Sequence, residues 1–134
     1  QPVSEALAFH VTCTSTKMGL EEKFKQVARA CTEQAIFPEQ VGCCGFAGDK
    51  GFTQPEINAW ALRKLKVQVD QLNGGYSNSR TCEIGLSRNS GIDYKSVMYL
   101  VRDARGLGAG RCIVEACLDA ARVRLDAIRV IVMR

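Results

Sequence analysis

"ALAFHVTC", residues 6–13, is a short apolar run that contains aromatic and β-branched residues and ends at a cysteine. This composition and length predict a buried β-strand. A turn through Met18 and Gly19 follows, and apolar residues then recur at spacings of three and four between Leu20 and Cys31. That spacing indicates the buried face of a helix. The chain therefore opens with a strand followed by a helix.

The middle of the chain continues the alternation. "QAIFPE", residues 34–39, predicts a second short strand that ends at its proline, and a loop with two adjacent cysteines follows. Thr53 and Glu56 have the spacing of a capping box, and apolar residues keep a helical period from there to Leu72. We therefore expect one helix to leave the cysteine loop.

Residues 73–101 are expected to add a short helix and a strand. "NGGYSNSR", residues 73–80, is typical of turns and has no core pattern. Ser79 is a candidate N-cap for a helix that begins at Arg80, and "YKSVMYLV", residues 94–101, predicts a strand. This order of elements predicts an α/β fold, a single three-layer domain with a small, mostly parallel sheet.

Charge and composition limit the classes of function. The 134 residues are 46% hydrophobic and 24% charged, which is typical of one globular domain. Basic residues outnumber acidic ones by only eleven to ten up to Val101, so nothing favours nucleic-acid binding. There is no apolar run of membrane-spanning length. Seven cysteines, an odd number, without a secretory signal favour a reduced, cytoplasmic setting, and the first residue, Gln1, suggests a fragment.

Two adjacent cysteines stand in "VGCCGFAGDKGF", residues 41–52. A disulfide between Cys43 and Cys44 would be strained, because neighbouring Cα atoms lie about 3.8 Å apart and disulfides prefer roughly 4.4–6.8 Å. A redox switch, a metal site and a tight turn with buried thiols all remain open. A metal site needs more ligands, and Cys13 and Cys82 can supply them from the ends of separate elements.

Other residues near this loop have candidate roles. Glycines allow a backbone to approach a cofactor closely, which makes Gly42, Gly45 and Gly48 candidates for supporting one. Lys50 and Arg80 are either solvated charges or cations that stabilise an anionic cofactor.

The remaining cysteines and the histidine favour structural roles. Cys31 lies on the apolar helix face, and Cys112 and Cys117 are five residues apart, which places them on different sides of a helix. His10 is three positions before Cys13 along a strand and is expected to point to the other face, as a structural histidine rather than a ligand.

Three segments together resemble a known module. "HVTCTSTKMGL", "VGCCGFAGDKGF" and "GYSNSRTCEIGLS" are similar to the cysteine-rich CCG domain at the carboxyl end of FAD-dependent D-lactate dehydrogenases that combine FAD-binding and iron–sulfur domains. The similarity runs from about Leu7 to Val101, so residues 1–103 are expected to form the CCG domain. Residues 104–134 resemble nothing known and are expected to form a tail, helical from Ile113 to Val130.

The resemblance implies a cofactor and a ligand set. It implies that Cys13, Cys43, Cys44 and Cys82 ligate an iron–sulfur cluster. The family pattern ends in a Cys-x-x-Cys pair, whereas this chain has Ser79 at the first of those positions. Four thiolates favour a simple 4Fe-4S cluster over a noncubane cluster held by five cysteines.

The resemblance also implies a function. The parent enzyme would oxidise D-lactate or a related 2-hydroxy acid at FAD, and this chain would relay electrons from other iron–sulfur domains toward a downstream acceptor. It has no recognisable flavin-binding segment and is not expected to be active alone. The parent would be cytoplasmic or peripherally associated with the inner face of the membrane. The alternative is a nonenzymatic module, either zinc-binding or metal-free.

Overall fold

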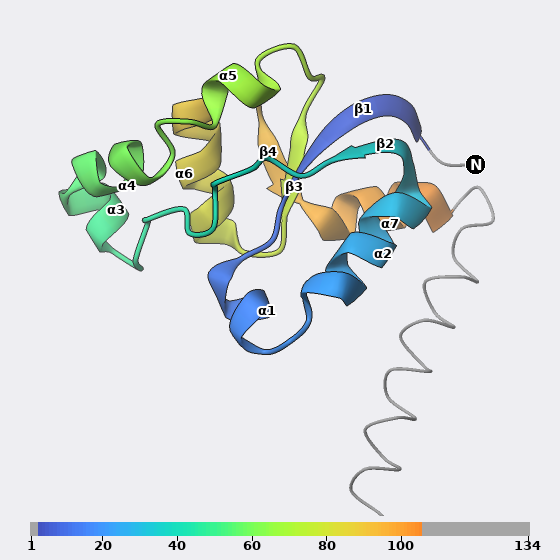
Figure 1. Cartoon of the computed structure of the whole chain (residues 1–134), viewed down its shortest axis with the longest axis horizontal. Helices are drawn as coiled ribbons and strands as arrows, with labels where there is room; N and C mark the ends of the chain where they lie inside the picture. The colour runs from blue at the N-terminus through green and yellow to red at the C-terminus, as the bar shows by residue number, and fades with distance from the viewer. Residues whose placement is uncertain (1–2, 106–134) are drawn as a thin grey trace, which may run out of the picture.

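The computed structural model describes residues 3–105, in which helices cover both faces of one small sheet (Figure 1). The sheet has the order β2-β1-β3-β4, and each neighbouring pair is parallel. Its strands are β1 (Val3–His10), β2 (Thr32–Ile36), β3 (Gly75–Ser77) and β4 (Tyr94–Ser96). The helices are α1 (Cys13–Lys17), α2 (Glu21–Cys31), α3 (Lys50–Thr53), α4 (Pro55–Ala61), α5 (Lys66–Val69), α6 (Arg80–Ser90) and α7 (Val97–Arg105). The predicted α/β class with a parallel sheet is confirmed.

Alternate residues of β1 build two separate cores, one on each face of the sheet. Leu7 and Phe9 face α2 and α7, where they join buried residues that include Phe24 and Leu100. Ala8 faces the other way, into a core of residues from the 41–48 loop, α5, α6 and the segments beside them. The period-two alternation of a strand thus divides the described chain into three layers.

The connections between strands leave the sheet in opposite directions on either side of β1. The chain passes from β1 through α2 to β2, and then crosses back through α3, α4 and α5 to β3 on the other side of β1. Loops at the carboxyl ends of β1 and β3 therefore diverge to opposite faces. Such a point in a parallel sheet opens a crevice between adjacent strands, and ligands commonly bind there.

Strand β3 was not expected, because residues 73–80 have the composition of a turn. Gly75 pairs with Ala8 on one side and with Tyr94 on the other. A Cβ atom at Gly75 would lie 2.5 Å from the Tyr94 ring. Glycine is therefore needed where the aromatic ring crosses the strand, and its turn-like composition hides a central strand.

The predicted strand over residues 94–101 is wrong in its second half. It ends at Ser96, and α7 follows directly. The Ser96 hydroxyl accepts a hydrogen bond from the backbone N–H of Met98, as a helix-capping residue does. Helix α7 also runs past Asp103, the predicted domain boundary, and Ala104 is fully buried in the core against α2.

The single helix predicted after the cysteine loop is also wrong, since three short helices take its place. Thr53 ends α3 instead of capping a longer helix, and Gln54 precedes α4. Pro55 has no backbone N–H, so α3 cannot continue through it. Gln68 of α5 then exchanges two hydrogen bonds with the backbone of Glu39, which ties the loop after β2 to this layer.

Within residues 3–105, no helix has both the length and the apolar character needed to cross a membrane. The predicted tail helix, with Cys112 and Cys117, lies outside the described residues.

Candidate metal centre

The loop after β2 presents Cys43 and Cys44 and then turns through a left-handed backbone at Gly45. Gly45 has a φ of +68°, and a Cβ atom there would lie 2.7 Å from the Cβ of Ala61. The side-chain amide of the buried Asn58 donates to the Cys44 carbonyl oxygen and so fixes the loop from the α4 side. The loop is thereby held rigidly against α4, with Cys44 buried and Cys43 exposed.

The predicted strand end at Cys13 is wrong, because β1 ends at His10 and Cys13, three positions later, is the first residue of α1. Thr12 caps this helix: its hydroxyl oxygen accepts a hydrogen bond from the backbone N–H of Ser15 at 3.3 Å. Asn78, which follows β3, donates to the Ser15 hydroxyl at 2.7 Å. The segment that carries Cys13 is therefore joined to the segment that leads to Cys82.

Cys82 is the third residue of α6, which begins at Arg80 as predicted. Ser79 occupies the N-cap position, but its hydroxyl makes no capping bond to the helix backbone and lies 3.2 Å from the hydroxyl of Thr81. Cys82 is 7% exposed and faces the cysteine loop. Its place in the first turn lets the free N–H groups of α6 favour a thiolate.

The four candidate cysteines share one cavity of about 670 Å³, which we call the cysteine cavity. Three segments that are distant in sequence build it at the carboxyl edge of the sheet. Its remaining lining consists of small, hydroxyl-bearing, amide and apolar residues, namely Thr12, Thr14, Ser15, Met18, Leu20, Ala47, Gly48, Asn78, Ser79 and Thr81. No charged side chain belongs to this lining among residues 3–105.

Cys44 and Cys82 are in direct thiol–thiol contact in the cysteine cavity, with 3.0 Å between their sulfur atoms. The thiol–thiol hydrogen bond with Cys82, together with the backbone N–H of Phe46, outweighs the effect of burial and lowers the pKa of Cys44 to about 6. The pKa of Cys82 is raised, because its proton is held by Cys44 and because it is buried. The contact therefore shifts the pKa values of the two thiols in opposite directions.

Cys43 has a different electrostatic setting. The backbone N–H of Gly45 donates to its sulfur at 3.4 Å and by itself lowers its pKa. Partial burial and the neighbouring thiols of Cys13 and Cys44 act in the opposite direction, and the pKa of Cys43 is raised overall.

The arrangement differs from a site for one metal ion. Among residues 3–105, no three histidine, cysteine, aspartate or glutamate side chains are grouped as ligands of a single ion. The four cysteines instead lie around a common space. In an iron–sulfur cluster each thiolate binds a different iron, so the ligand sulfurs surround the cofactor without meeting at one point. The cysteines are the type of ligand that such a cofactor uses, but the Cys44 and Cys82 sulfurs, 3.0 Å apart, would have to separate in order to bind different irons.

Only some of the residues that the sequence predicted to support a cofactor line the cysteine cavity. Gly48, with a φ of +70°, lines the cysteine cavity, whereas Gly42 lines a neighbouring cavity and has open space around it. Neither Lys50 nor Arg80 lines the cysteine cavity. Arg80 instead pairs with the buried carboxylate of Glu83, at 3.0 Å.

The structure also separates structural residues from candidate ligands. Cys31 lies in the core between α2 and the sheet, as predicted. His10 is buried and lines a second cavity, away from the lining of the cysteine cavity. Asn58 could not be identified from the sequence, because its role depends on the Cys44 carbonyl and on Asn89, which donates to its side-chain oxygen at 2.6 Å.

Comparisons of this chain with protein-family models, with curated proteins and with solved structures found no match.

Proposed function

We propose that this chain is an iron–sulfur electron-relay domain in which Cys13, Cys43, Cys44 and Cys82 hold a 4Fe-4S cluster. The observation that carries the proposal is the meeting of these four cysteines, from three distant segments, around one cavity at the carboxyl edge of a parallel sheet. Thiolates are the ligands that iron–sulfur clusters use. When bound, a cluster of this kind takes up and releases single electrons.

The chain's own groups would prepare the site for an anionic cofactor without charged side chains. The Gly45 N–H donates to the Cys43 sulfur, and the contact with Cys82 lowers the pKa of Cys44. Hydroxyl groups of residues such as Thr14, Ser79 and Thr81 line the same space. Hydrogen bonds to cluster sulfurs are one way in which proteins adjust a reduction potential. In this proposal Lys50 and Arg80 make no direct contact with the cluster, because neither residue lines the cysteine cavity.

The parent protein would be a flavin-dependent dehydrogenase of D-lactate or a related 2-hydroxy acid. This part of the proposal rests on the resemblance of the three cysteine segments to CCG domains. FAD and the remaining iron–sulfur centres would belong to partner domains, and a downstream acceptor would receive the electrons. The parent would act in the cytoplasm, at the inner face of the membrane when it is associated with one.

The alternative is a nonenzymatic interaction module that is zinc-binding or metal-free. The 3.0 Å contact between Cys44 and Cys82 favours the metal-free version, because the two thiols already satisfy each other. A cluster would require these two side chains to separate, so the two proposals predict different states of the pair.

Anaerobic reconstitution of the full chain tests the proposal. Iron and acid-labile sulfide should each reach about four per chain, with broad visible absorbance. Replacing any one of the four cysteines by alanine should abolish stable binding of the cluster. Cys31→Ala is the matched control, since Cys31 is a cysteine buried on the other face of the sheet. Zinc bound at one per chain, or full iron loading of the Cys82→Ala variant, would contradict the cluster.

A further inference from the structure

Two thiol groups are already in contact inside the cysteine cavity. The sulfur atoms of Cys44 and Cys82 lie 3.0 Å apart, and both residues line the cavity. An S–S bond is about 2.05 Å long, so the two sulfurs need to approach by only about 1 Å to become bonded. The pair therefore has the position of a dithiol that can be oxidised to a disulfide.

One buried side chain, that of Asn58, holds both of the segments that carry these thiols. Its amide nitrogen donates to the Cys44 carbonyl oxygen, and its amide oxygen accepts a hydrogen bond from Asn89 of α6 at 2.6 Å. Cys82 belongs to the first turn of the same helix. A Cβ atom at Gly85, three residues after Cys82, would lie 2.5 Å from the Asn58 amide nitrogen. Because α6 and the cysteine loop both pack against Asn58, the fold itself keeps the two thiols opposite each other.

The other cysteines of residues 3–105 are less well placed to bond with this pair. Cys43 is the chain neighbour of Cys44, and a disulfide between adjacent residues is strained. Cys31 lies in the core on the other face of the sheet. Cys13 and Cys43 line the same cavity and form the competing pair that an experiment has to separate from Cys44 and Cys82.

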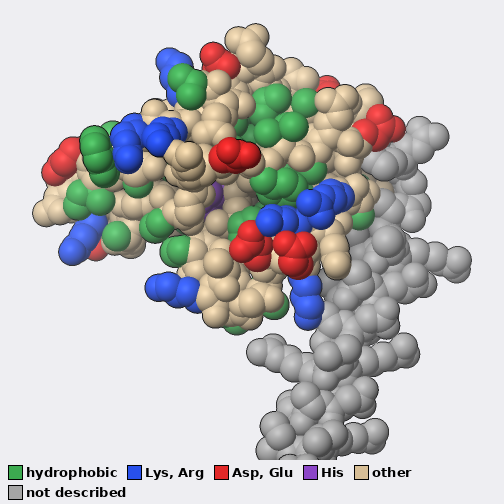
Figure 2. All heavy atoms as spheres, in the orientation of Figure 1, with side chains coloured by type: hydrophobic (Ala, Val, Ile, Leu, Met, Phe, Trp, Pro, Cys, Tyr) green, Lys and Arg blue, Asp and Glu red, His purple; other side chains and the backbone are tan. Residues whose placement is uncertain are grey.

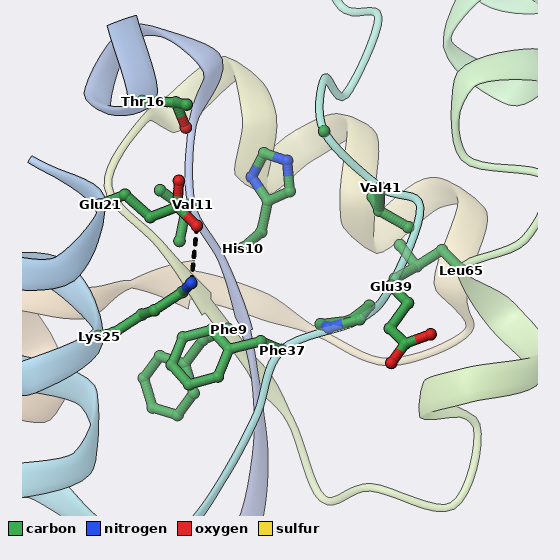
Figure 3. Close-up of a pocket in the computed structure, with 12 residues that line it drawn as sticks. Phe9, His10, Val11, Thr16, Glu21, Lys25, Phe37, Glu39, Val41 and Leu65 are labelled. Atoms are coloured by element: carbon green, nitrogen blue, oxygen red, sulfur yellow. Dashed lines mark ion pairs between the residues drawn. The ribbon is translucent and has the colours of Figure 1, made fainter. Parts of the chain in front are cut away.

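The cysteine cavity is the route by which a reagent reaches the pair. Cys44 and Cys82 line it but are only 4% and 7% exposed, so a small reagent has the best access. The neighbouring cavity of about 340 Å³, drawn in Figure 3, has no cysteine in its lining within residues 3–105. An oxidant must therefore be small enough to enter the cysteine cavity.

The lining of the cavity also favours an uncharged oxidant. Figure 2 shows acidic and basic side chains spread over the outer surface, whereas none from residues 3–105 lines the cysteine cavity. A charged reagent would lose its hydration there without gaining a partner of opposite charge. Hydrogen peroxide is small and neutral, and it oxidises thiols.

We propose that Cys44 and Cys82 of the metal-free chain form a reversible disulfide when hydrogen peroxide oxidises them. One thiol sulfur attacks a peroxide oxygen, the O–O bond breaks, and a sulfenic acid and one water form. The second thiol sulfur then attacks the sulfenic sulfur, the S–O bond breaks, and another water leaves as the S–S bond forms. The two thiols lose two electrons and two protons, and the peroxide becomes two waters. A dithiol reductant restores the thiols by exchange.

The disulfide makes the four-cysteine site sensitive to its redox surroundings. While Cys44 and Cys82 are bonded to each other, two of the four proposed ligands cannot bind iron. This consequence rests on the proposed function, whereas the disulfide itself rests on the thiol contact and on the Asn58 hydrogen bonds. The pair thus keeps the empty site from binding a cluster until a reductant is present.

Oxidation of the reduced, metal-free full chain with one equivalent of hydrogen peroxide tests the proposal. Alkylation of the remaining thiols and tryptic digestion should give one linked pair of peptides, residues 30–50 and 81–88, which dithiothreitol separates again. Serine variants identify the cysteine within residues 30–50. The link should form in Cys43→Ser and in the control Cys31→Ser, and it should be absent in Cys44→Ser.

Several outcomes would overturn the proposal. They are the absence of the linked peptides, a link from residues 30–50 to the peptide that contains Cys13 instead, and a link that forms equally well in Cys44→Ser. Oxidation of Cys44 to a sulfinic acid without a link would do the same. Because the experiment contains no iron, its failure would leave the cluster proposal standing, and a chain that binds no iron could still form the disulfide.

Discussion

The sulfur atoms of Cys44 and Cys82 lie 3.0 Å apart, although 38 residues separate them in the sequence. Cys44 comes from the loop after β2, and Cys82 comes from the first turn of α6 after β3. They meet because both loops leave the carboxyl edge of a parallel sheet. The contact gives the two thiols different proton affinities, which has consequences that can be measured.

In the metal-free protein, one thiol should ionise near pH 6. The thiolate absorbance of the reduced chain should show this step, which belongs to Cys44. Cys82→Ala removes the donor and should raise the pKa of Cys44 toward its ordinary value, whereas Cys82→Ser keeps a donor and should preserve most of the shift. Cys31→Ala should leave the step in place. A wild-type chain that loses no thiol proton below pH 8 would show that the pair does not share a proton.

The same pair should make folding stability depend on pH. The pKa of Cys44 is lowered in the folded state from 9.0, the ordinary value that applies in the unfolded chain, to about 6. Between these values the unfolded chain binds one more proton than the folded chain, so stability should rise as the pH increases from 6 to 9. Above pH 9 it should fall again, because Cys82 keeps its proton only when folded. Urea unfolding of the reduced protein across this range measures both slopes.

Gly45→Ala should destabilise the domain by about 3 kcal/mol, because the backbone is left-handed there and the new methyl group would meet Ala61. Gly48→Ala should cost only about 1–2 kcal/mol, since that residue is left-handed but has open space. Gly42→Ala should be nearly neutral, because neither condition applies. Urea midpoints of the three variants give the ranking. Equal urea midpoints for the three variants would show that a methyl group at Gly45 meets no more steric hindrance than one at Gly42 or Gly48.

Asn58→Leu should destabilise the domain by about 2–3 kcal/mol, because it leaves the Cys44 carbonyl and the Asn89 amide without their partner. The loop should also lose its fixed position. If the cluster proposal holds, reconstituted protein should release iron to a chelator faster than wild type. The exposed Asn73→Leu is the control and should change neither property.

Truncation after Arg105 should preserve cooperative unfolding, whereas truncation after Ser96 should abolish it. Val97, Leu100 and Ala104 of α7 are buried against the sheet and α2, so removing this helix opens one of the two cores. Urea unfolding followed by circular dichroism compares the two. Loss of cooperativity in the longer fragment would mean that residues after Arg105 belong to the folding unit.

The isolated chain should not oxidise D-lactate with an artificial electron acceptor, because no flavin-binding segment is recognisable in it. Steady-state assays with purified chain and a buffer blank test this. Turnover above the blank, with flavin in the sample, would show that the proposed division between the relay domain and a flavin domain is wrong.

The sequence by itself determined the α/β class and the cysteines that meet. Apolar residues that recur with the period of a strand or of a helix indicate which side chains are buried. This hydrophobic periodicity is the strongest signal of secondary structure in a sequence. Cys13 and the Cys43–Cys44 loop could be placed at strand ends for that reason. In a parallel sheet the carboxyl ends share one edge, so their convergence followed.

Only the tertiary structure decided features that depend on a distant partner. Gly75 is a strand residue because the Tyr94 ring crosses it, and that ring comes from another strand. Asn58 matters through the Cys44 carbonyl, and the contact between the Cys44 and Cys82 thiols exists because two loops meet. The contact of His10 Nδ1 with the Ser77 hydroxyl likewise joins two neighbouring strands. Local composition cannot report these contacts, since their energies arise between segments that are brought together only when the sheet forms.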